Sequence, residues 1–230
     1  MSYIFESPDV VWELLLGHLF MVGMALLIGL LIALPIGILL THYRQLTVVI
    51  MGTLGTLYTI PSLAMLILLL PLFGLNKQSV IVALVIYVQV ILVRNIVTGL
   101  QSVSPAILEA SRGMGMNAWQ RWWRIQVPLA LPVILAGVRI ASVVAIGIAA
   151  IGAKFGAGGL GDLLFDGIAQ NRNDKIYAGV IALGLLALLV NFGIMVLERR
   201  FDPAARIRRA ERRQRAATSH RRKEPAPAQG

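Results

Sequence analysis

The sequence predicts an all-α membrane protein, a polytopic bundle of about five transmembrane helices. Hydrophobic residues make up 57% of the 230 residues and charged residues only 14%, whereas an ordinary soluble domain has about 45–50% and 25%. The apolar residues form long runs that suit helices crossing a hydrocarbon layer about 30 Å thick, without the alternation of barrel strands. The chain has no cysteine, which excludes disulfides, cysteine-ligated zinc and a thiol nucleophile.

Five segments are apolar enough to cross the bilayer. Four are uninterrupted or nearly so: residues 14–40, 80–100, 131–153 and 178–197. The fifth, residues 46–73, has Pro61 near its middle. A straight helix of that length would measure about 42 Å at 1.5 Å per residue, which is longer than a bilayer requires, and two halves would each be too short. We therefore predict one span that is kinked or locally unwound at Pro61.

The distribution of charge predicts the orientation. The formal net charge is +10, and most of it lies in the C-terminal tail. With the N-terminus outside and the C-terminus inside, sixteen Lys and Arg residues face the cytoplasm and four face outward, as the positive-inside rule requires. Residues 201–230 then form a basic cytoplasmic tail, partly disordered. A nucleic-acid partner is not expected, because this tail lacks a folded recognition motif.

The loop between the third and fourth spans has a defined plan. Ser104 and Pro105 are typical of a helix start, and they predict a short helix over 105–112. Asn117 can cap a second short helix over 118–124. Such short helices are marginal in water, so either the bilayer surface or a protein partner must brace them.

The same loop carries a spaced motif. It consists of an acidic residue and two small residues, then a glycine, then an isoleucine with a proline three residues after it. These residues are Glu109, Ala110, Ser111, Gly115, Ile125 and Pro128. This pattern resembles the EAA signature of permease subunits of ATP-binding-cassette importers, which reads EAA, three residues, Gly, nine residues and I-x-L-P. Ser111 replaces the second alanine and Val127 replaces the leucine, and the spacing is unchanged. Pro128 and Pro132 are expected to mark re-entry into the membrane.

The resemblance implies a domain over residues 14–200 and a set of partners. In that family the loop is a coupling helix that docks on a separate cytoplasmic ATPase, which binds the ATP and magnesium. An extracytoplasmic solute-binding protein and a second permease subunit, identical or similar, complete the complex in the inner membrane. The chain contains no Walker A sequence, so we expect it to bind no ATP by that route and to be no enzyme itself.

Two further stretches indicate a solute class. Residues 156–161 formally satisfy G-x-G-x-x-G, but a dinucleotide site needs a βαβ unit, and this run follows a predicted span. It resembles the IGAGGLG stretch of the osmoprotectant branch of these permeases, and residues 58–64 resemble Q-T-I-P-S-L-A of the same branch. The resemblance implies import of glycine betaine, choline or a similar solute. A permease for another solute, or an ATPase-independent secondary transporter, remains an alternative; the latter would normally show internal repeats.

Polar residues within spans are candidates for a solute path, because they are costly in lipid. The candidates are Tyr58, Thr59, Ser62, Gln89 and Arg139. Tyr58 is favoured because aromatic faces attract quaternary ammonium groups. The alternative role for each is contact between helices, and Arg139 could either reach the inner headgroups or pair within the bundle.

Aromatic and charged residues near the spans complete the predictions. Trp119, Trp122 and Trp123 recur at helical spacing and interleave with arginines, which indicates anchors at the lipid headgroups rather than stacking platforms for nucleic acid. The outer loop, residues 156–176, is the expected docking surface for the binding protein. The three histidines, at positions 18, 42 and 220, are too widely spaced to predict a metal site.

Overall fold

The computed structural model describes Tyr3 and residues 6–201, so the tail predicted over 201–230 lies almost wholly outside the described residues. The described chain folds into helices and short helical turns. In chain order these are α2 (Pro8–His42), α3 (Arg44–Thr59), α4 (Ser62–Phe73), α5 (Lys77–Gln101), α6 (Pro105–Gly113), α7 (Ala118–Arg121), the π-helical turn η1 (Trp122–Gln126), α8 (Val127–Gly152), the 3₁₀ turn η2 (Ala153–Phe155), α9 (Gly161–Ala169) and α10 (Asn173–Phe201).

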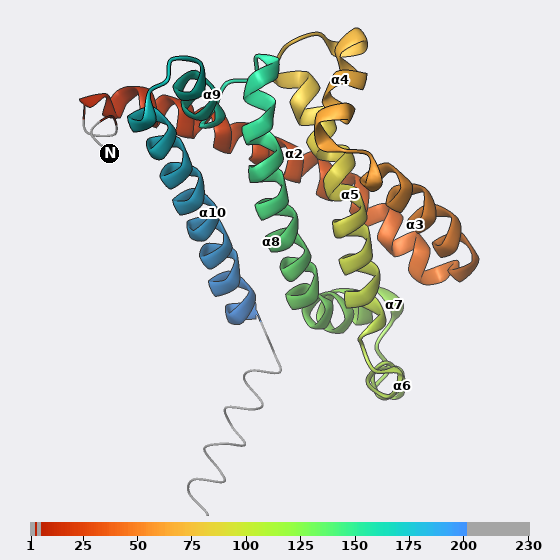
Figure 1. Ribbon diagram of the computed structural model, residues 1–230. Coiled ribbons are helices and arrows are strands. Elements are labelled where there is room, and N and C mark those ends of the chain that lie inside the picture. The colour runs from red at the N-terminus through yellow and green to blue at the C-terminus, as the bar shows by residue number, and fades with distance from the viewer. Residues whose placement is uncertain (1–2, 4–5, 202–230) are drawn as a thin grey trace, which may run out of the picture.

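Four helical stretches in the described chain are long and apolar enough to cross a membrane. They are α2, α5, α10 and the continuous stretch that contains α7, η1 and α8, and the bent pair α3–α4 makes a fifth if it counts as one span. This confirms the predicted all-α membrane bundle. In Figure 1 the start of α2, α4 and α9 lie toward one end of the bundle, whereas α6, α7 and the end of α10 lie toward the other. The outside and inside assignment of these ends stays a prediction.

Helix α5 lies at the centre and packs on both α2 and α8. Glycines allow the close approach on both sides. A Cβ atom on Gly37 of α2 would lie 2.4 Å from Cγ2 of Ile96, and one on Gly137 of α8 would lie 2.4 Å from Cβ of Asn95. Gly29 meets Val88 and Gly152 meets Val80 in the same way. Small residues are favoured at such contacts because, in lipid, helix association depends on close packing.

The second predicted span is interrupted at Pro61, as predicted. The change of direction there is larger than that of a kinked helix. Helices α3 and α4 meet at 96°, so they form two helices rather than one bent helix. Proline lacks a backbone N–H and disfavours the helical conformation at the residue before it, and Ile60 is indeed extended, with φ −62° and ψ 127°. The Tyr87 hydroxyl of α5 donates a hydrogen bond to the Ile60 carbonyl oxygen, which holds the break against the core.

The second short helix of the loop, predicted over 118–124, continues without a gap into α8. Helix α7 stops at Arg121, and η1 then leads directly into α8. Pro128 lies in the first turn of α8, where its missing N–H is tolerated. Its ring would crowd the Arg124 carbonyl in a regular α-helix, and the wider π turn immediately before it relieves that contact. The change of helix type thus comes just before Pro128, Pro132 lies inside α8, and re-entry into the membrane at these prolines stays a prediction.

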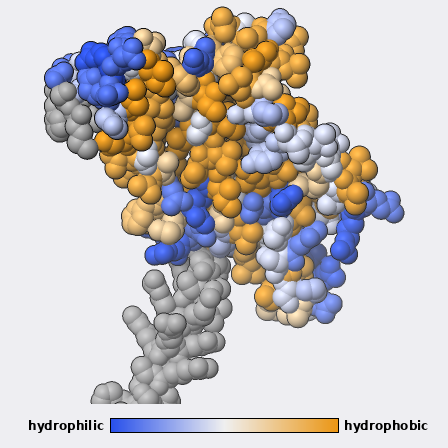
Figure 2. All heavy atoms as spheres, in the orientation of Figure 1, coloured by the Kyte–Doolittle hydropathy of each residue, from blue (hydrophilic) through white to orange (hydrophobic). Residues whose placement is uncertain are grey.

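The lipid-facing surface is apolar around the middle of the molecule. Figure 2 shows hydrophobic side chains over much of the visible middle and hydrophilic ones toward both ends. Among the candidate spans α5 is the most buried and α10 the least. The exposed side chains of α10 include Leu185, Leu188, Leu189 and Phe192. Such a surface suits hydrocarbon rather than water.

Substituting Gly37 tests the helix spacing at the core. Gly37→Ala should lower the free energy of unfolding by about 1–3 kcal/mol, because its Cβ would overlap the branched, rigid part of Ile96. Gly23→Ala, in the same helix, meets nothing within 4 Å and should change stability by at most about 1 kcal/mol, in the favourable direction. Thermal unfolding in detergent measures both variants, and equal melting temperatures would contradict the proposed packing.

Candidate functional site

The loop between α5 and α8 is a compact, hydrogen-bonded unit. Helix α6 begins at Pro105 and ends at a turn in which Met116 N donates to the Ser111 carbonyl, at 3.1 Å. Gly115 in that turn has φ +77°, a left-handed conformation that costs other residues roughly 1–2 kcal/mol. The turn therefore separates α6 from α7 within a few residues and favours glycine at position 115.

Helix α7 starts with the cap that Asn117 predicted. The Asn117 side chain accepts a hydrogen bond from Gln120 N at 2.8 Å, and the Gln120 side chain accepts one from Asn117 N at 3.0 Å. This reciprocal pair is a capping box. Arg121 Nη1 donates to the Met116 carbonyl at 2.8 Å, so the turn is bonded to the helix that follows it.

The motif residues divide between exposed and buried positions. Glu109, Ala110 and Gly115 are exposed, whereas Ser111 is buried and its hydroxyl donates to the Leu108 carbonyl at 2.6 Å. Ile125 and Pro128 are half-buried in the continuous stretch leading to α8. The structure thus gives α6 one side that includes the buried Ser111 and one side on which Glu109 and Ala110 are exposed.

The three tryptophans lie on the same stretch of the loop as the motif. Trp119 and Trp123 are exposed and their rings pack edge to face, with centroids 5.5 Å apart, while Trp122 is half-buried. Amphipathic rings at such positions favour the interface between headgroups and hydrocarbon. Their role as membrane anchors stays a prediction.

Three of the predicted path residues gather at the break between α3 and α4. Tyr58 is 41% exposed, and its ring packs edge to face on Tyr87 with centroids 5.8 Å apart. Thr59 is exposed and donates to the Thr56 carbonyl at 2.7 Å, while Ser62 begins α4. The break therefore presents the exposed Tyr58 ring, backed by the buried Tyr87, beside the carboxyl end of α3, where the helix dipole is negative.

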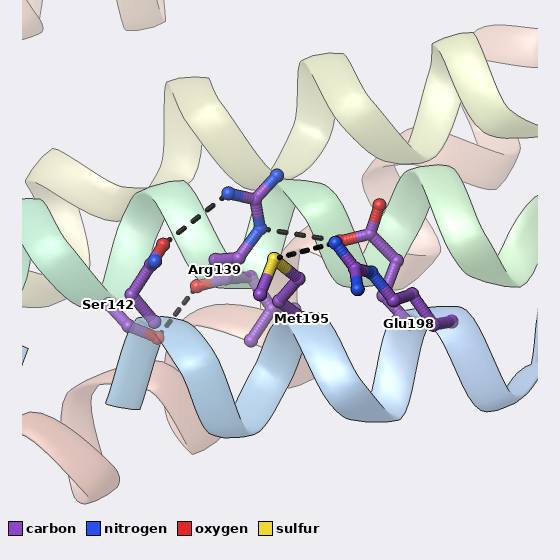
Figure 3. A network of polar contacts seen from close by, with 7 residues as sticks. Arg139, Ser142, Met195 and Glu198 are labelled. Atoms are coloured by element: carbon purple, nitrogen blue, oxygen red, sulfur yellow. Dashed lines mark hydrogen bonds and ion pairs between the residues drawn. The ribbon is translucent and has the colours of Figure 1, made fainter. Parts of the chain in front are cut away.

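Gln89 and Arg139 occupy contacts between helices instead. Gln89 is 6% exposed, and its Nε2 donates to the Gly29 carbonyl of α2 at 3.1 Å. Arg139 of α8 points toward α10 (Figure 3), where its Nε donates to Glu198 Oε2 at 3.3 Å and its Nη1 donates to Asn191 Oδ1 at 3.4 Å. Of the two arrangements considered for Arg139, the structure has the paired one. Its two partners, more than 50 residues away in sequence, could not be identified from spacing.

The glycine-rich run at the opposite end locks several elements together. Gly156, Gly158 and Gly159 have φ values of +71°, +74° and +87°. Gly161 lies against α8, where an added Cβ would be 2.1 Å from the Ala150 carbonyl oxygen. The run therefore requires glycine for backbone geometry, which accounts for its G-x-G-x-x-G pattern without a nucleotide.

His18 of α2 packs under this run, a role that the sequence did not reveal. Its side chain is fully buried, and Nε2 lies 3.2 Å from the Ile146 carbonyl of α8, to which it can donate. A Cβ on Gly159 would be 3.0 Å from its Nδ1. The histidine thus connects α2, α8 and the glycine-rich run.

Helix α9 follows and carries two carboxylates. Burial raises the pKa of Asp162, the nearby Asp166 raises it further, and Lys77 opposes both effects. After α9, Arg172 pairs with Asp174 at 2.5 Å, and this hydrogen bond lowers the pKa of Asp174. The loop therefore presents both signs of charge at this end of the bundle.

Breaking the Arg139 contact should loosen α10 from α8. Glu198→Gln should lower the free energy of unfolding by about 1–2 kcal/mol, because it leaves a partly buried guanidinium without its anion. Arg199→Gln, at the next residue, should cost less than about 0.5 kcal/mol, because Arg199 is exposed and its side chain contacts only Met195 Sδ, at 3.6 Å, within α10. Thermal unfolding in detergent gives both values. If Arg139→Gln combined with Glu198→Gln is as unstable as the sum of the single variants, the two residues do not interact.

The fold resembles a known transporter subunit. The chain superposes on a chain of the inward-facing MetNI methionine ABC transporter with a TM-score of 0.75 and 22% sequence identity, covering 84% of this chain and 97% of that one. At this identity the likeness establishes the shared fold.

Sequence relatives are closer. The carnitine transport permease protein OpuCB of Listeria monocytogenes is 39% identical over 188 residues, 82% of this chain and 86% of the relative. The osmoprotectant import permease protein OsmW of Salmonella typhimurium is 36% identical over 195 residues, 83% and 91% of the two chains. The glycine betaine/carnitine/choline transport system permease protein OpuCB of Bacillus subtilis is 34% identical, covering 81% and 86%. Residues 11–207 match the family model, and the chain belongs to the family of binding-protein-dependent transport system inner membrane components.

Proposed function

We propose that this chain is the transmembrane permease subunit of an ATP-driven importer for a quaternary ammonium osmoprotectant, such as glycine betaine, choline or carnitine. The observation that carries the proposal is that relatives named for these solutes align over more than four fifths of the chain. The aromatic pair Tyr58 and Tyr87, beside the negative end of α3, suits passage of a cation with a methylated ammonium group.

The loop geometry supports coupling to a separate ATPase. The exposed Glu109 and Ala110 of α6 form the docking side, while the Ser111 carbonyl accepts a hydrogen bond from Met116 N and so connects α6 to the turn that follows. Displacement of α6 passes through the turn at Gly115 to α7, and from α7 through η1 to α8 without a break in the helical chain. ATP-driven closure of the motor then tilts α8, which switches the pore between inward-open and outward-open states.

Two further partners complete the proposed importer. A second permease subunit would cover α3, which has no buried residue in this chain; its Gly52 and Gly55 meet nothing within 4 Å and leave room for another helix. A solute-binding protein would dock at the opposite end, where α9 and the following loop present charges of both signs.

Reconstitution tests this function directly. Proteoliposomes that contain this chain, its ATPase and its binding protein should take up radiolabelled glycine betaine, choline or carnitine only when ATP is inside the vesicle with the ATPase. Solute-loaded binding protein should stimulate ATP hydrolysis. Uptake without an ATPase would indicate a secondary transporter, and stimulation only by an unrelated solute, such as an amino acid, would overturn the osmoprotectant assignment.

Gly115→Arg should uncouple ATP hydrolysis from solute uptake. The variant must hold arginine at φ +77°, which costs roughly 1–2 kcal/mol and lowers the equilibrium constant for forming the native turn by a factor of about 5–30. We therefore expect uptake to fall, by at most about that factor, while ATP hydrolysis and membrane insertion persist.

Gly113→Arg is the matched control. Gly113 ends α6 with ordinary helical geometry and open space around it, so the same added charge should be tolerated there. Proteoliposome uptake and ATP hydrolysis are measured for both variants. Coupled uptake at the wild-type rate by the Gly115 variant would contradict the coupling role of this turn.

A further inference from the structure

A cavity of about 690 Å³ lies between the loop and the ends of α2 and α5. Its polar wall is formed by cationic or hydrogen-bonding side chains, among them Thr41, His42, Arg112, Arg121 and Gln126, and none of the lining residues is acidic. Cavities between transmembrane helices at the cytoplasmic side that gather arginines suit anionic lipid headgroups. The charge of the wall therefore favours an anionic occupant.

The two arginines come from different parts of the loop and converge on the cavity. The Arg112 carbonyl accepts a hydrogen bond from Gly115 N at 2.9 Å, whereas its guanidinium, which lines the cavity, makes no hydrogen bond or ion pair within the described chain. Arg121 donates one hydrogen bond from Nη1 to the Met116 carbonyl, which fixes the guanidinium beside the turn and leaves its other donors available. Guanidinium groups recognise phosphate through charge-assisted, often bidentate hydrogen bonds.

The rest of the wall suits the part of a lipid next to its phosphate. Ile38, Leu100 and Leu108 provide apolar surface, and Trp119 and Trp122 line the same cavity. Tryptophan is enriched at the level of the headgroups. The cavity therefore combines cations for a phosphate with apolar walls for a glycerol backbone and the first carbons of an acyl chain.

We propose that this cavity binds the phosphate of an anionic phospholipid from the adjacent leaflet, held between Arg112 and Arg121. The lipid joins the loop to the ends of α2 and α5, and so braces short helices that would be marginal alone. The site does not depend on which solute the protein carries.

The same loop helix can serve the lipid and the ATPase on different faces. Leu108 and Arg112 are four residues apart and face the cavity together. Ala106 and Ala110, also four apart, lie on the far side of α6 and are exposed. Glu109, which completes the proposed docking side with Ala110, is also exposed and does not line the cavity. Docking through these residues thus leaves the cavity to the lipid, which is why a lipid is favoured over a segment of the ATPase.

Lipid retention by the full-length chain tests the proposal. The purified protein is incorporated into nanodiscs of equal parts phosphatidylcholine and phosphatidylglycerol, released into mild detergent, and examined by native mass spectrometry for retained phosphatidylglycerol. Wild type should retain it. Arg112→Gln and Arg121→Gln should each reduce retention about fivefold, as expected for the loss of one arginine near an anionic headgroup.

Arg124→Gln is the matched control, because Arg124 lies in the same stretch, is exposed and does not line the cavity. It should retain the lipid as wild type does. Equal retention by all three variants would overturn the site. Arg112→Lys and Arg121→Lys keep the charge and should retain most of the lipid, so a loss caused by misfolding is separated from a loss of charge.

Two further arms identify the occupant. Inorganic phosphate is added to wild type in nanodiscs of phosphatidylcholine alone; if millimolar phosphate raises the melting temperature and Arg112→Gln abolishes that rise, the site takes free phosphate, and the lipid assignment is overturned. The ATPase is then added to the phosphatidylglycerol-loaded protein. Continued retention supports the lipid site, whereas displacement of the lipid together with crosslinks from position 112 to the ATPase assigns the cavity to the protein partner.

Discussion

Close packing of α5 against α2 and α8 through glycines is the constraint on which the structure depends. In a bilayer, apolar side chains gain little by leaving lipid for a neighbouring helix, so the spacing of backbones determines how well helices adhere. Gly37 and Gly137 place α5 within reach of both neighbours. At the loop end, a Cβ on Gly99 would lie 2.9 Å from the Ala130 carbonyl oxygen. The loop between α5 and α8 therefore leaves and rejoins the bundle at two helices already in contact, and its position follows theirs.

At the opposite end of the bundle, glycines again allow close packing, here between α8 and the start of α9. Gly161 brings the start of α9 onto α8, and Gly159 leaves room for the buried His18 of α2. Both ends of α8 are thus attached at glycine contacts, one to α5 and the other to the α9 loop. A helix held in this way moves as a rigid rod about its packed faces more readily than it bends, because each contact is close and specific. That property would suit the coupling role proposed for the loop.

The local features of the fold followed from the sequence, whereas the long-range pairings did not. Length and apolar runs identified the spans, Pro61 located the break, and Asn117 and Gly115 marked the cap and turn, since each depends on one residue and its immediate neighbours. The sharpness of the break also depends on Tyr87, which lies 27 residues away and bonds Ile60. The partners of Arg139, the burial of His18 and the cavity of the loop join segments that no periodicity connects. The π turn was missed because Pro128 alone predicts a helix start, whatever the helix type before it.

The Arg139 contact determines how α10 follows α8. Apart from its packing against α8 and α9, α10 faces outward with large apolar side chains. Apolar contacts alone would offer little resistance to α10 sliding along α8. Arg139 engages Asn191 and Glu198, which lie seven residues apart on one face of α10, about two helical turns. A guanidinium bonded at two levels resists translation along the helix axis in either direction, since movement that shortens one bond lengthens the other. A tilt of α8 that starts at the loop would therefore carry α10 with it. We expect α8 and α10 to move together as one rigid body.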